Sequence, residues 1–292
     1  MRSGRNFCTW ISIFVLGALL AGCGAARLGY SNGETISYFW LDNYVDFDAE
    51  QKPWVKKEID SLFAWHRQTQ LKDYVQVLTR LQKQVMAPVS EAQLLANEDE
   101  LKKKLLVMTD KAAPSIAMLA MSMKPAQIAH MQEKFDANND KYRKEFLRGD
   151  VEKRQAYRLK KTMSQAEYWF GSFSSAQEAQ IKAASYARPL NNELLLASRL
   201  ARQAQILAII KKVEAEKLNK EATAALIRNF ATDVIEKQAT PEQKAFFDGY
   251  DPVERKMIAL IFNITTPEQK QHFVQTLQQW IDDFNKLSAK AA

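Results

Sequence analysis

The segments 237-KQATPEQKAFF-247 and 263-NITTPEQKQHF-273 share the tetrapeptide Thr-Pro-Glu-Gln, which stands directly before a stretch with spaced apolar residues. Threonine is a favourable N-cap, proline fits the first helical position, and glutamine at the third position can reach back to the N-cap amide. The two segments therefore predict helix starts at Pro241 and Pro267. The fold class follows from how often this signature returns along the chain.

Related signatures stand at four other points. Asp48, Ser90 and Ser174 each lie three residues before a glutamine, and Lys124 keeps the spacing with a residue that caps poorly. Efficient helix initiation explains each copy by itself. The repetition also resembles the Leu-Thr-x-x-Gln motif of Spy and CpxP, which are small helical periplasmic proteins of chaperone type. The leucine is not kept here, because the residue before the cap is Phe47, Val89, Met123, Phe173, Ala239 or Thr265.

Glycine is scarce beyond the first tenth of the chain. Of nine glycines, only Gly149, Gly171 and Gly249 follow Gly33, so few tight hairpin turns are expected. Apolar residues recur at helical spacing, and no alternating strand pattern of useful length appears. The predicted fold class is all-α, a multi-helix antiparallel array or bundle. Helices are expected at 35–44, 49–86, 90–111, 115–122, 125–147, 151–170, 175–186, 190–217, 220–237, 241–248, 252–263 and 267–289.

The N-terminus has the features of a bacterial lipoprotein signal peptide. Arg2 and Arg5 precede an apolar stretch that is shorter than a membrane span, and small residues follow it. The sequence Leu20-Ala21-Gly22-Cys23 resembles the lipobox, in which the cysteine thiol receives a diacylglycerol and the chain is cut before it. The alternative is an ordinary secretory signal. We expect a signal peptide at 1–22, a lipidated tether at 23–35 and an all-helical domain at 36–292, with a possible division near 171–189.

The resemblance to lipoproteins also implies a location. Residue 24 is glycine rather than aspartate. By analogy with lipoprotein sorting in Gram-negative bacteria, this favours the outer membrane, with the protein facing the periplasm and bound to the membrane through acyl chains on Cys23. The only other cysteine, Cys8, lies in the expected signal peptide.

Four longer stretches carry a family resemblance. They are 27-RLGYSN-32, 40-WLDNYVDFDAEQ-51, 124-KPAQIAHMQEKFDANNDKYRKEF-146 and 166-AEYWFGSFSSAQ-177. They are similar to a family of proteobacterial lipoproteins classified as a domain of unknown function. The resemblance implies an all-α lipoprotein and supplies no activity, cofactor or catalytic residue.

Residues with catalytic or metal-binding chemistry do not form a recognisable pattern. The three histidines are His66, His130 and His272, and none belongs to a His-x-x-x-His or Glu-x-x-His motif. His130 and Glu133 share a helix face, but two ligands do not make a metal site. No Gly-x-Ser-x-Gly motif or phosphate-binding loop is present. We expect no metal, no cofactor and no enzymatic activity.

Aromatic residues gather just after the tether. Residues 34–50 contain five acidic and no basic residues, interleaved with Tyr38, Phe39, Trp40, Tyr44 and Phe47. One interpretation is a helix that docks its aromatic face into the core. The other is an aromatic-lined groove for a peptide or a lipid.

Basic residues gather later in the chain. Nine basic residues lie between 141 and 161 against Glu145, Asp150 and Glu152, a net charge of +6; the chain without residues 1–22 carries 39 basic and 34 acidic residues, or +5. The lysine and arginine stems are expected to spread outward from the helices. The candidate face for an anionic partner consists of Lys141, Arg143, Lys144, Arg148, Lys153, Arg154, Arg158, Lys160 and Lys161. A solvated pair of helices is the alternative.

The sequence predicts a non-enzymatic binding protein of the envelope, of chaperone or assembly-factor type. Its partner would be an anionic envelope component or a periplasmic protein. Nucleic acid is not expected as a partner for an exported lipoprotein. A scaffolding lipoprotein without client binding is the alternative, and an envelope enzyme with an unrecognised site is the third possibility.

Overall fold

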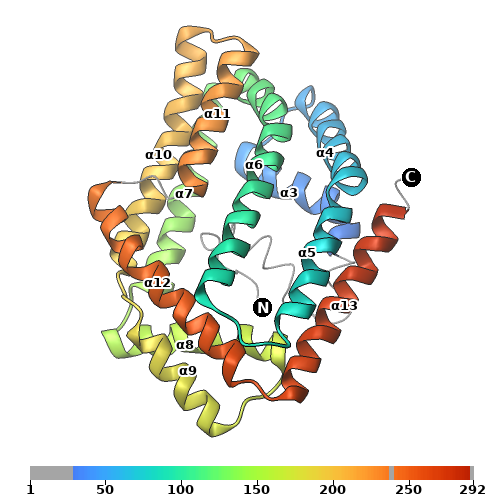
Figure 1. The fold of residues 1–292 in the computed structure, drawn as a ribbon. Coiled ribbons are helices and arrows are strands. Elements are labelled where there is room, and N and C mark those ends of the chain that lie inside the picture. Colours follow the sequence, from blue (N-terminus) through green and yellow to red (C-terminus); the bar gives the residue numbers. More distant parts are fainter. Residues whose placement is uncertain (1–28, 237–239, 290–292) are drawn as a thin grey trace, which may run out of the picture.

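The structure is a computed structural model that describes residues 29–236 and 240–289. Within these ranges the chain forms helices and no strands (Figure 1), which confirms the predicted all-α class. The helices are α3 Gly33–Val45, α4 Gln51–Thr69, α5 Leu71–Gln84, α6 Glu91–Ser122, α7 Pro125–Phe146, α8 Val151–Phe170, α9 Ser175–Ala187, α10 Asn192–Glu216, α11 Lys220–Ile235, α12 Pro241–Ile264 and α13 Pro267–Ala289.

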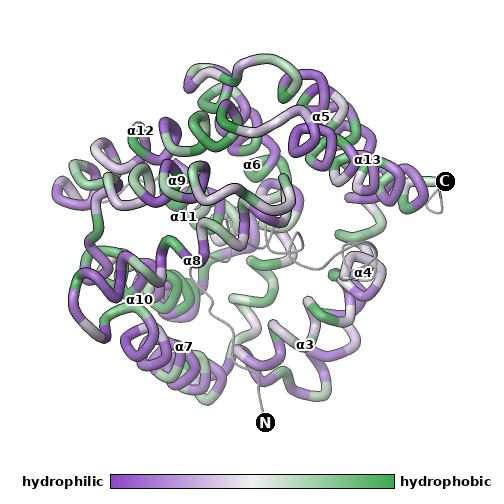
Figure 2. The backbone as a smooth tube through the Cα atoms, turned by 90° about the horizontal axis from the view of Figure 1, so that it is seen from below, coloured by the Kyte–Doolittle hydropathy of each residue, from purple (hydrophilic) through white to green (hydrophobic). Residues whose placement is uncertain are grey.

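The contacts between these helices form a closed circuit. Starting at α3, each helix contacts the next in the order α3, α4, α5, α13, α8, α9, α12, α6, α11, α10 and α7, and α7 contacts α3 again. Figure 2 shows α3 between α4 and α7 at the edge of the molecule, where the circuit closes. The predicted array is therefore one that closes on itself. The expected division near 171–189 stays a prediction.

The expected helix at 49–86 is wrong in one respect, because the chain changes direction at Gln70. Backbone hydrogen bonds continue across this point, from the Gln70 N–H to the His66 carbonyl and from the Tyr74 N–H to the Gln70 carbonyl. The two halves nevertheless follow different neighbours, since α4 packs on α3 and α5 packs along α13. The bend is thus a consequence of tertiary packing, which the apolar periodicity of the segment does not encode.

Two other expected boundaries are wrong in the opposite sense, because helices expected to be separate are continuous. The helices expected at 90–111 and 115–122 are one helix, α6, and those expected at 241–248 and 252–263 are one helix, α12. A proline removes one backbone hydrogen bond and usually ends a helix. Pro114 and Pro252 are instead carried inside continuous helices. In α6, the fully buried Ala113 and Ala117 flank the proline and pack against α11, which holds the helix together on both sides.

The predicted caps are present. The Gln93 N–H donates to the Ser90 hydroxyl and the Ser90 N–H donates to Gln93 Oε1, and the same reciprocal pair joins Ser174 to Gln177. Asp48 and Thr266 form equivalent pairs with the glutamines three residues later. At Lys124 the glutamine half of the motif remains, with the Lys124 N–H donating to Gln127 Oε1 over 3.0 Å. Helix initiation is therefore one role of the repeated signature.

The same glutamines also join helix starts that are distant in sequence. The side-chain amides of Gln51 and Gln127 bond reciprocally, with Nε2 to Oε1 distances of 3.2 and 2.7 Å. Gln51 Nε2 also donates to the Ser122 carbonyl, and Gln127 Nε2 donates to the Asp46 carbonyl. In both cases the acceptor lies two residues before the cap of the partner helix. The corner between α3 and α4 is thereby joined to the corner between α6 and α7.

A second pair repeats this arrangement. Gln177 and Gln269 bond reciprocally, at 2.8 and 3.3 Å, and donate to the carbonyls of Ile264 and Ser172. These acceptors again lie two residues before the partner's cap. The corner between α8 and α9 is thereby joined to the corner between α12 and α13. We call these two junctions the glutamine pairs.

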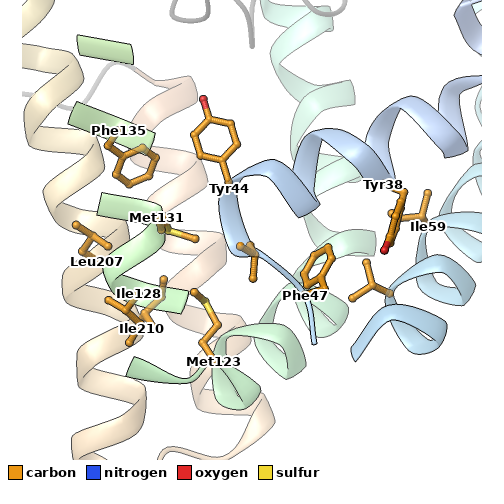
Figure 3. Packing of buried hydrophobic residues seen from close by; sticks show 12 residues of the cluster. Tyr38, Tyr44, Phe47, Ile59, Met123, Ile128, Met131, Phe135, Leu207 and Ile210 are labelled. Carbon is orange, nitrogen blue, oxygen red and sulfur yellow. The ribbon is translucent and has the colours of Figure 1, made fainter. Parts of the chain in front are cut away.

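Two apolar clusters lie around the two glutamine pairs. The first contains Phe47 and Met123, each directly before a cap, and Figure 3 shows Tyr44 of α3 directed toward Phe135 and Met131 of α7. The second contains Phe173 and, from α13, Leu277. At the caps of α4, α7 and α9, the residue directly before the cap is thus a core residue, and it fixes the position of the corner.

Removing one glutamine of a pair should destabilise the fold more than removing a glutamine that only caps. Gln127→Met removes both amide bonds to Gln51, which keeps its bonds to Ser122 and Asp48, and it takes away the side-chain donor to the Asp46 carbonyl. We expect a loss of about 3 kcal/mol in the free energy of unfolding. Gln93→Met is the matched control, since Gln93 is exposed and bonds within its own capping box, and it should cost about 1 kcal/mol. Urea unfolding measures both.

A double-mutant cycle tests the pairing directly. Gln51→Met combined with Gln127→Met should cost about 1 kcal/mol less than the sum of the single losses, because each single change already breaks the reciprocal bonds. Additive losses, or a Gln127→Met cost equal to that of Gln93→Met, would show that the pair contributes nothing beyond capping.

Candidate binding surface

The basic segment spans the corner between α7 and α8. Gly149 has a φ of +84°, and this left-handed residue lets the chain turn between the two helices. The rings of Tyr142 and Phe146 stack with centroids 4.6 Å apart, and Tyr157 packs edge-on against Phe146 at 5.5 Å. These aromatic side chains are half-buried at the corner, and the cationic side chains surround them.

The structure divides the nine basic residues into two groups. Seven are exposed: Lys141, Arg143, Lys144, Arg148, Lys153, Lys160 and Lys161. For Arg154 and Arg158 the expectation of an outward-facing side chain is wrong. Arg154 bonds to the Leu147 carbonyl over 2.5 Å and to Glu193 over 2.6 Å. Arg158 donates to the carbonyls that end α9 and begin the loop to α10, those of Ser185, Arg188 and Pro189.

Arg158 is turned inward because the end of α9 offers it unpaired carbonyl groups. The last carbonyls of a helix have no partner within the helix, and a guanidinium can bond to several of them at once. Burial, together with the nearby charge of Arg188, lowers the pKa of Arg158 from its ordinary value. Sequence spacing places a basic residue on a helix face, but it cannot show that a helix end from elsewhere in the chain lies against it.

Arg188, which the sequence analysis did not single out, joins three helices. Its side chain is 5% exposed and pairs with Glu254 of α12 over 3.2 Å. It also donates to Thr162 of α8 and Ser185 of α9. Buried charges need a partner and several hydrogen bonds, and this arginine has both. We interpret Arg188 as a structural residue rather than as part of a binding site.

The aromatic segment follows the first of the two expected interpretations for its buried residues. Tyr38, Tyr44 and Phe47 are buried in the first cluster, which confirms docking into the core for these residues. Phe39 and Trp40 are 64% and 37% exposed, and the ring of Trp40 packs against that of Tyr44 with centroids 5.1 Å apart. The aromatic groove stays a prediction.

The histidines make contacts between helices. His130 Nε2 lies 3.2 Å from the Asn43 carbonyl, and His272 Nδ1 lies 2.9 Å from the Trp169 carbonyl. His66 Nδ1 lies 2.7 Å from the Tyr30 hydroxyl, and its Nε2 lies 3.4 Å from that of Tyr74. Among the described residues, no three His, Cys, Asp or Glu side chains are grouped so as to hold a metal ion. The absence of an enzymatic activity stays a prediction.

Cys23, the predicted lipid attachment site, lies outside the described residues, as does the predicted signal peptide. The described helix that is long and apolar enough to span a membrane by length and composition is α6. These same features also suit a long helix inside a folded domain. The lipid anchor and the location therefore stay predictions.

Comparison with known proteins places most of the chain in one family. Residues 43–230 match a family of unknown function, DUF6279. The matched range contains the Gln51–Gln127 pair and the whole basic segment, and it ends before α12. No curated protein and no solved structure matches the chain.

The partly buried position of His66 predicts a dependence of stability on pH. Desolvation lowers the pKa of His66 to about 4, whereas an unfolded histidine has a pKa of 6.5. Between these values the unfolded chain binds more protons than the folded one, so the free energy of unfolding should fall as the pH falls from about 6.5 to about 4. The slope from this residue is about 1 kcal/mol per pH unit. In His66→Gln, urea unfolding should show a shallower slope in this window; an unchanged slope would contradict the assignment.

Proposed function

Because the chain belongs to DUF6279, a family of unknown function, we propose a function from its own sequence and structure. The protein is a lipid-anchored, non-enzymatic binding protein of the cell envelope. It is held by acyl chains on Cys23, at the outer membrane and facing the periplasm. Its body binds an anionic envelope component through the exposed basic residues at the corner of α7 and α8. The observation that carries the proposal is the concentration of seven exposed cations at one corner of an all-helical body.

The surroundings of the corner support binding to negative charge. Of the acidic residues within the segment, Glu145 is engaged by the Tyr157 hydroxyl, and Asp150 caps α8 by accepting from the Lys153 N–H at 2.9 Å. Arg143 pairs with Asp140 over 2.8 Å, so its charge is partly balanced. No described residue forms an ion pair with Lys141, Lys144 or Arg148. Exposed charges of one sign attract an oppositely charged surface over about a Debye length.

A scaffolding role without a client is the second candidate. The observation that favours it is the closed circuit of helices, which is held by two glutamine pairs and contains the buried Arg188 junction. A body of this kind suits a rigid spacer. The two candidates differ in whether the exposed cations recognise anything.

The first test concerns the anchor. Cys23→Ser should abolish incorporation of labelled palmitate, leave the precursor uncleaved before residue 23, and remove the protein from the outer-membrane fraction. The physical reason is that stable anchoring needs two or more acyl chains, which the serine variant cannot receive. Retained labelling would show that Cys23 is not the acylated residue.

The second test concerns the cations. In a chain that begins at residue 24, replacement of Lys141, Lys144 and Arg148 by glutamine should weaken binding to anionic vesicles by on the order of a hundredfold at low salt. The estimate assumes about 1 kcal/mol for each basic residue near an anionic surface. Glutamine retains helix propensity and adds no negative charge to the end of α7.

The matched control removes the same number of charges elsewhere. Lys182, Lys211 and Lys220 are exposed on α9, α10 and α11, and their replacement by glutamine should change vesicle binding by less than about threefold, which corresponds to less than 1 kcal/mol. Equal losses in the two triple variants would mean that net charge, rather than the corner of α7 and α8, is responsible. No loss in either would favour the scaffold.

A further inference from the structure

One face of α3 is apolar and points away from the body. Ile36, Phe39 and Trp40 are 44%, 64% and 37% exposed, and their spacing of three and four residues places them on one side of the helix. The side that faces the body carries the buried Tyr38 and Val45, and the buried Tyr44 lies at the edge of the stripe, with its ring centroid 5.1 Å from that of Trp40. We call the exposed residues the α3 stripe. Single exposed apolar residues are common on proteins, but a helical stripe of an isoleucine and two large aromatic residues is not.

The α3 stripe continues into a basic row on α7. Asn43, one turn beyond Phe39 and Trp40, accepts from Lys134 Nζ at Oδ1 over 3.0 Å, and its carbonyl lies 3.2 Å from His130 Nε2. From Lys134, steps of seven and three residues lead to Lys141 and Lys144 on the same side of α7, and Arg148 follows just after the end of the helix. Figure 2 shows α3 and α7 next to each other at the edge of the molecule. Aromatic and cationic side chains therefore share one surface.

The acidic residues of α3 do not oppose this arrangement. Glu34 pairs with Arg67, Asp42 accepts from the Phe47 N–H over 2.9 Å, and Asp48 pairs with Lys124 over 2.8 Å. Asp46 and Glu50 of the segment are exposed, as are Glu133, Asp136 and Asp140 of α7, of which Asp140 pairs with Arg143. Two of the five acidic residues of segment 34–50, Glu34 and Asp48, are thus balanced by a basic partner.

The length of the chain before α3 limits how far this surface can be from a membrane anchor. Five residues, 24–28, lie between Cys23 and Gly29, where the described residues begin. The six Cα-to-Cα steps of a fully extended chain span at most about 3.6 Å each, or roughly 22 Å in total. If Cys23 carries acyl chains in a bilayer, Gly29, which stands shortly before the first residue of α3, lies within this distance of the lipid surface.

We propose that the α3 stripe and the basic row of α7 together dock onto the phospholipid leaflet that holds the acyl chains of Cys23. The stripe enters the interfacial region, where aromatic side chains are favourable, and the cations face the anionic headgroups. This inference rests on the proposed lipid anchor and identifies the anionic partner as phospholipid. A stripe on an outer helix face suits a fluid surface, whereas a peptide needs a groove that can satisfy its backbone groups.

The docking can be tested with the lipidated protein itself, reconstituted into vesicles that contain an anionic phospholipid. Once the signal peptide with Cys8 is removed and Cys23 is acylated, an introduced cysteine is the one free thiol. An environment-sensitive fluorophore at Phe39→Cys should shift to shorter wavelength and be quenched by lipids with nitroxide-labelled acyl chains. The same fluorophore at Met86→Cys, an exposed apolar position after α5, is the matched control and should show neither effect.

A second reporter separates the side chains of the stripe from the probe. The fluorophore is placed at the exposed Thr35→Cys, with the stripe either intact or changed to Phe39→Ser and Trp40→Ser. Losing two partly buried aromatic contacts should lower the ratio of docked to undocked protein by about tenfold. Added salt, or glutamine at Lys134, Lys141, Lys144 and Arg148, should lower it as well.

The outcomes distinguish the two proposals. If the protein does not float with vesicles in a density gradient, the lipid anchor itself is wrong. If it floats but the probe at position 39 stays as exposed to water as the probe at position 86, the anchor holds and the docking surface is wrong. Quenching at position 35 that persists in the serine variant, or crosslinks from position 39 in cells that reach protein rather than lipid, would also overturn the docking.

Discussion

The fold depends on pairs of glutamine side chains, of which Gln51, Gln127 and Gln177 are buried and Gln269 is partly buried. A primary amide has two donors and an acceptor with two lone pairs, and burying it without partners costs several kcal/mol. In Gln51, Gln127, Gln177 and Gln269, Oε1 accepts from the cap of its own helix and from the partner glutamine, while Nε2 reaches the chain that precedes the partner's cap. A network of this kind stabilises only when every member is in place. Two distant helix corners are therefore held at one separation.

The need to give every polar group a partner also explains the positions of Arg158 and Arg188. A guanidinium carries five N–H donors in a plane, so it can bond to several carbonyl groups at a helix end. Arg158 does so at the end of α9, and Arg188 joins α8, α9 and α12 with Glu254 as its counter-charge. The basic segment thus consists of residues that hold the body together and residues left for the surface. The division follows from which side of each helix faces a carbonyl-rich helix end.

The surface that remains combines two features with different physical ranges. Cations act over about a Debye length and orient the molecule before contact, whereas aromatic rings act only on contact. On α3 and α7 the two lie side by side because α3 packs its other face on α7 and α4. A tether at Cys23 would add a third restraint, which limits the distance to the bilayer. Together these restraints would fix which face of the body the membrane meets and which faces remain open to the periplasm.

The sequence by itself determined the helical class and most helix starts. Scarce glycine, apolar periodicity and the caps at Asp48, Ser90, Ser174 and Thr266 are local signals, and local hydrogen bonds satisfy them. Tertiary structure alone decided that α6 and α12 continue through Pro114 and Pro252, that the chain bends at Gln70, and that Arg158 turns inward. It also decided the partner of each glutamine and which side of α3 stays exposed. The physical reason is that these outcomes depend on groups that lie far apart in the sequence, and spacing along one helix contains no information about what packs against it.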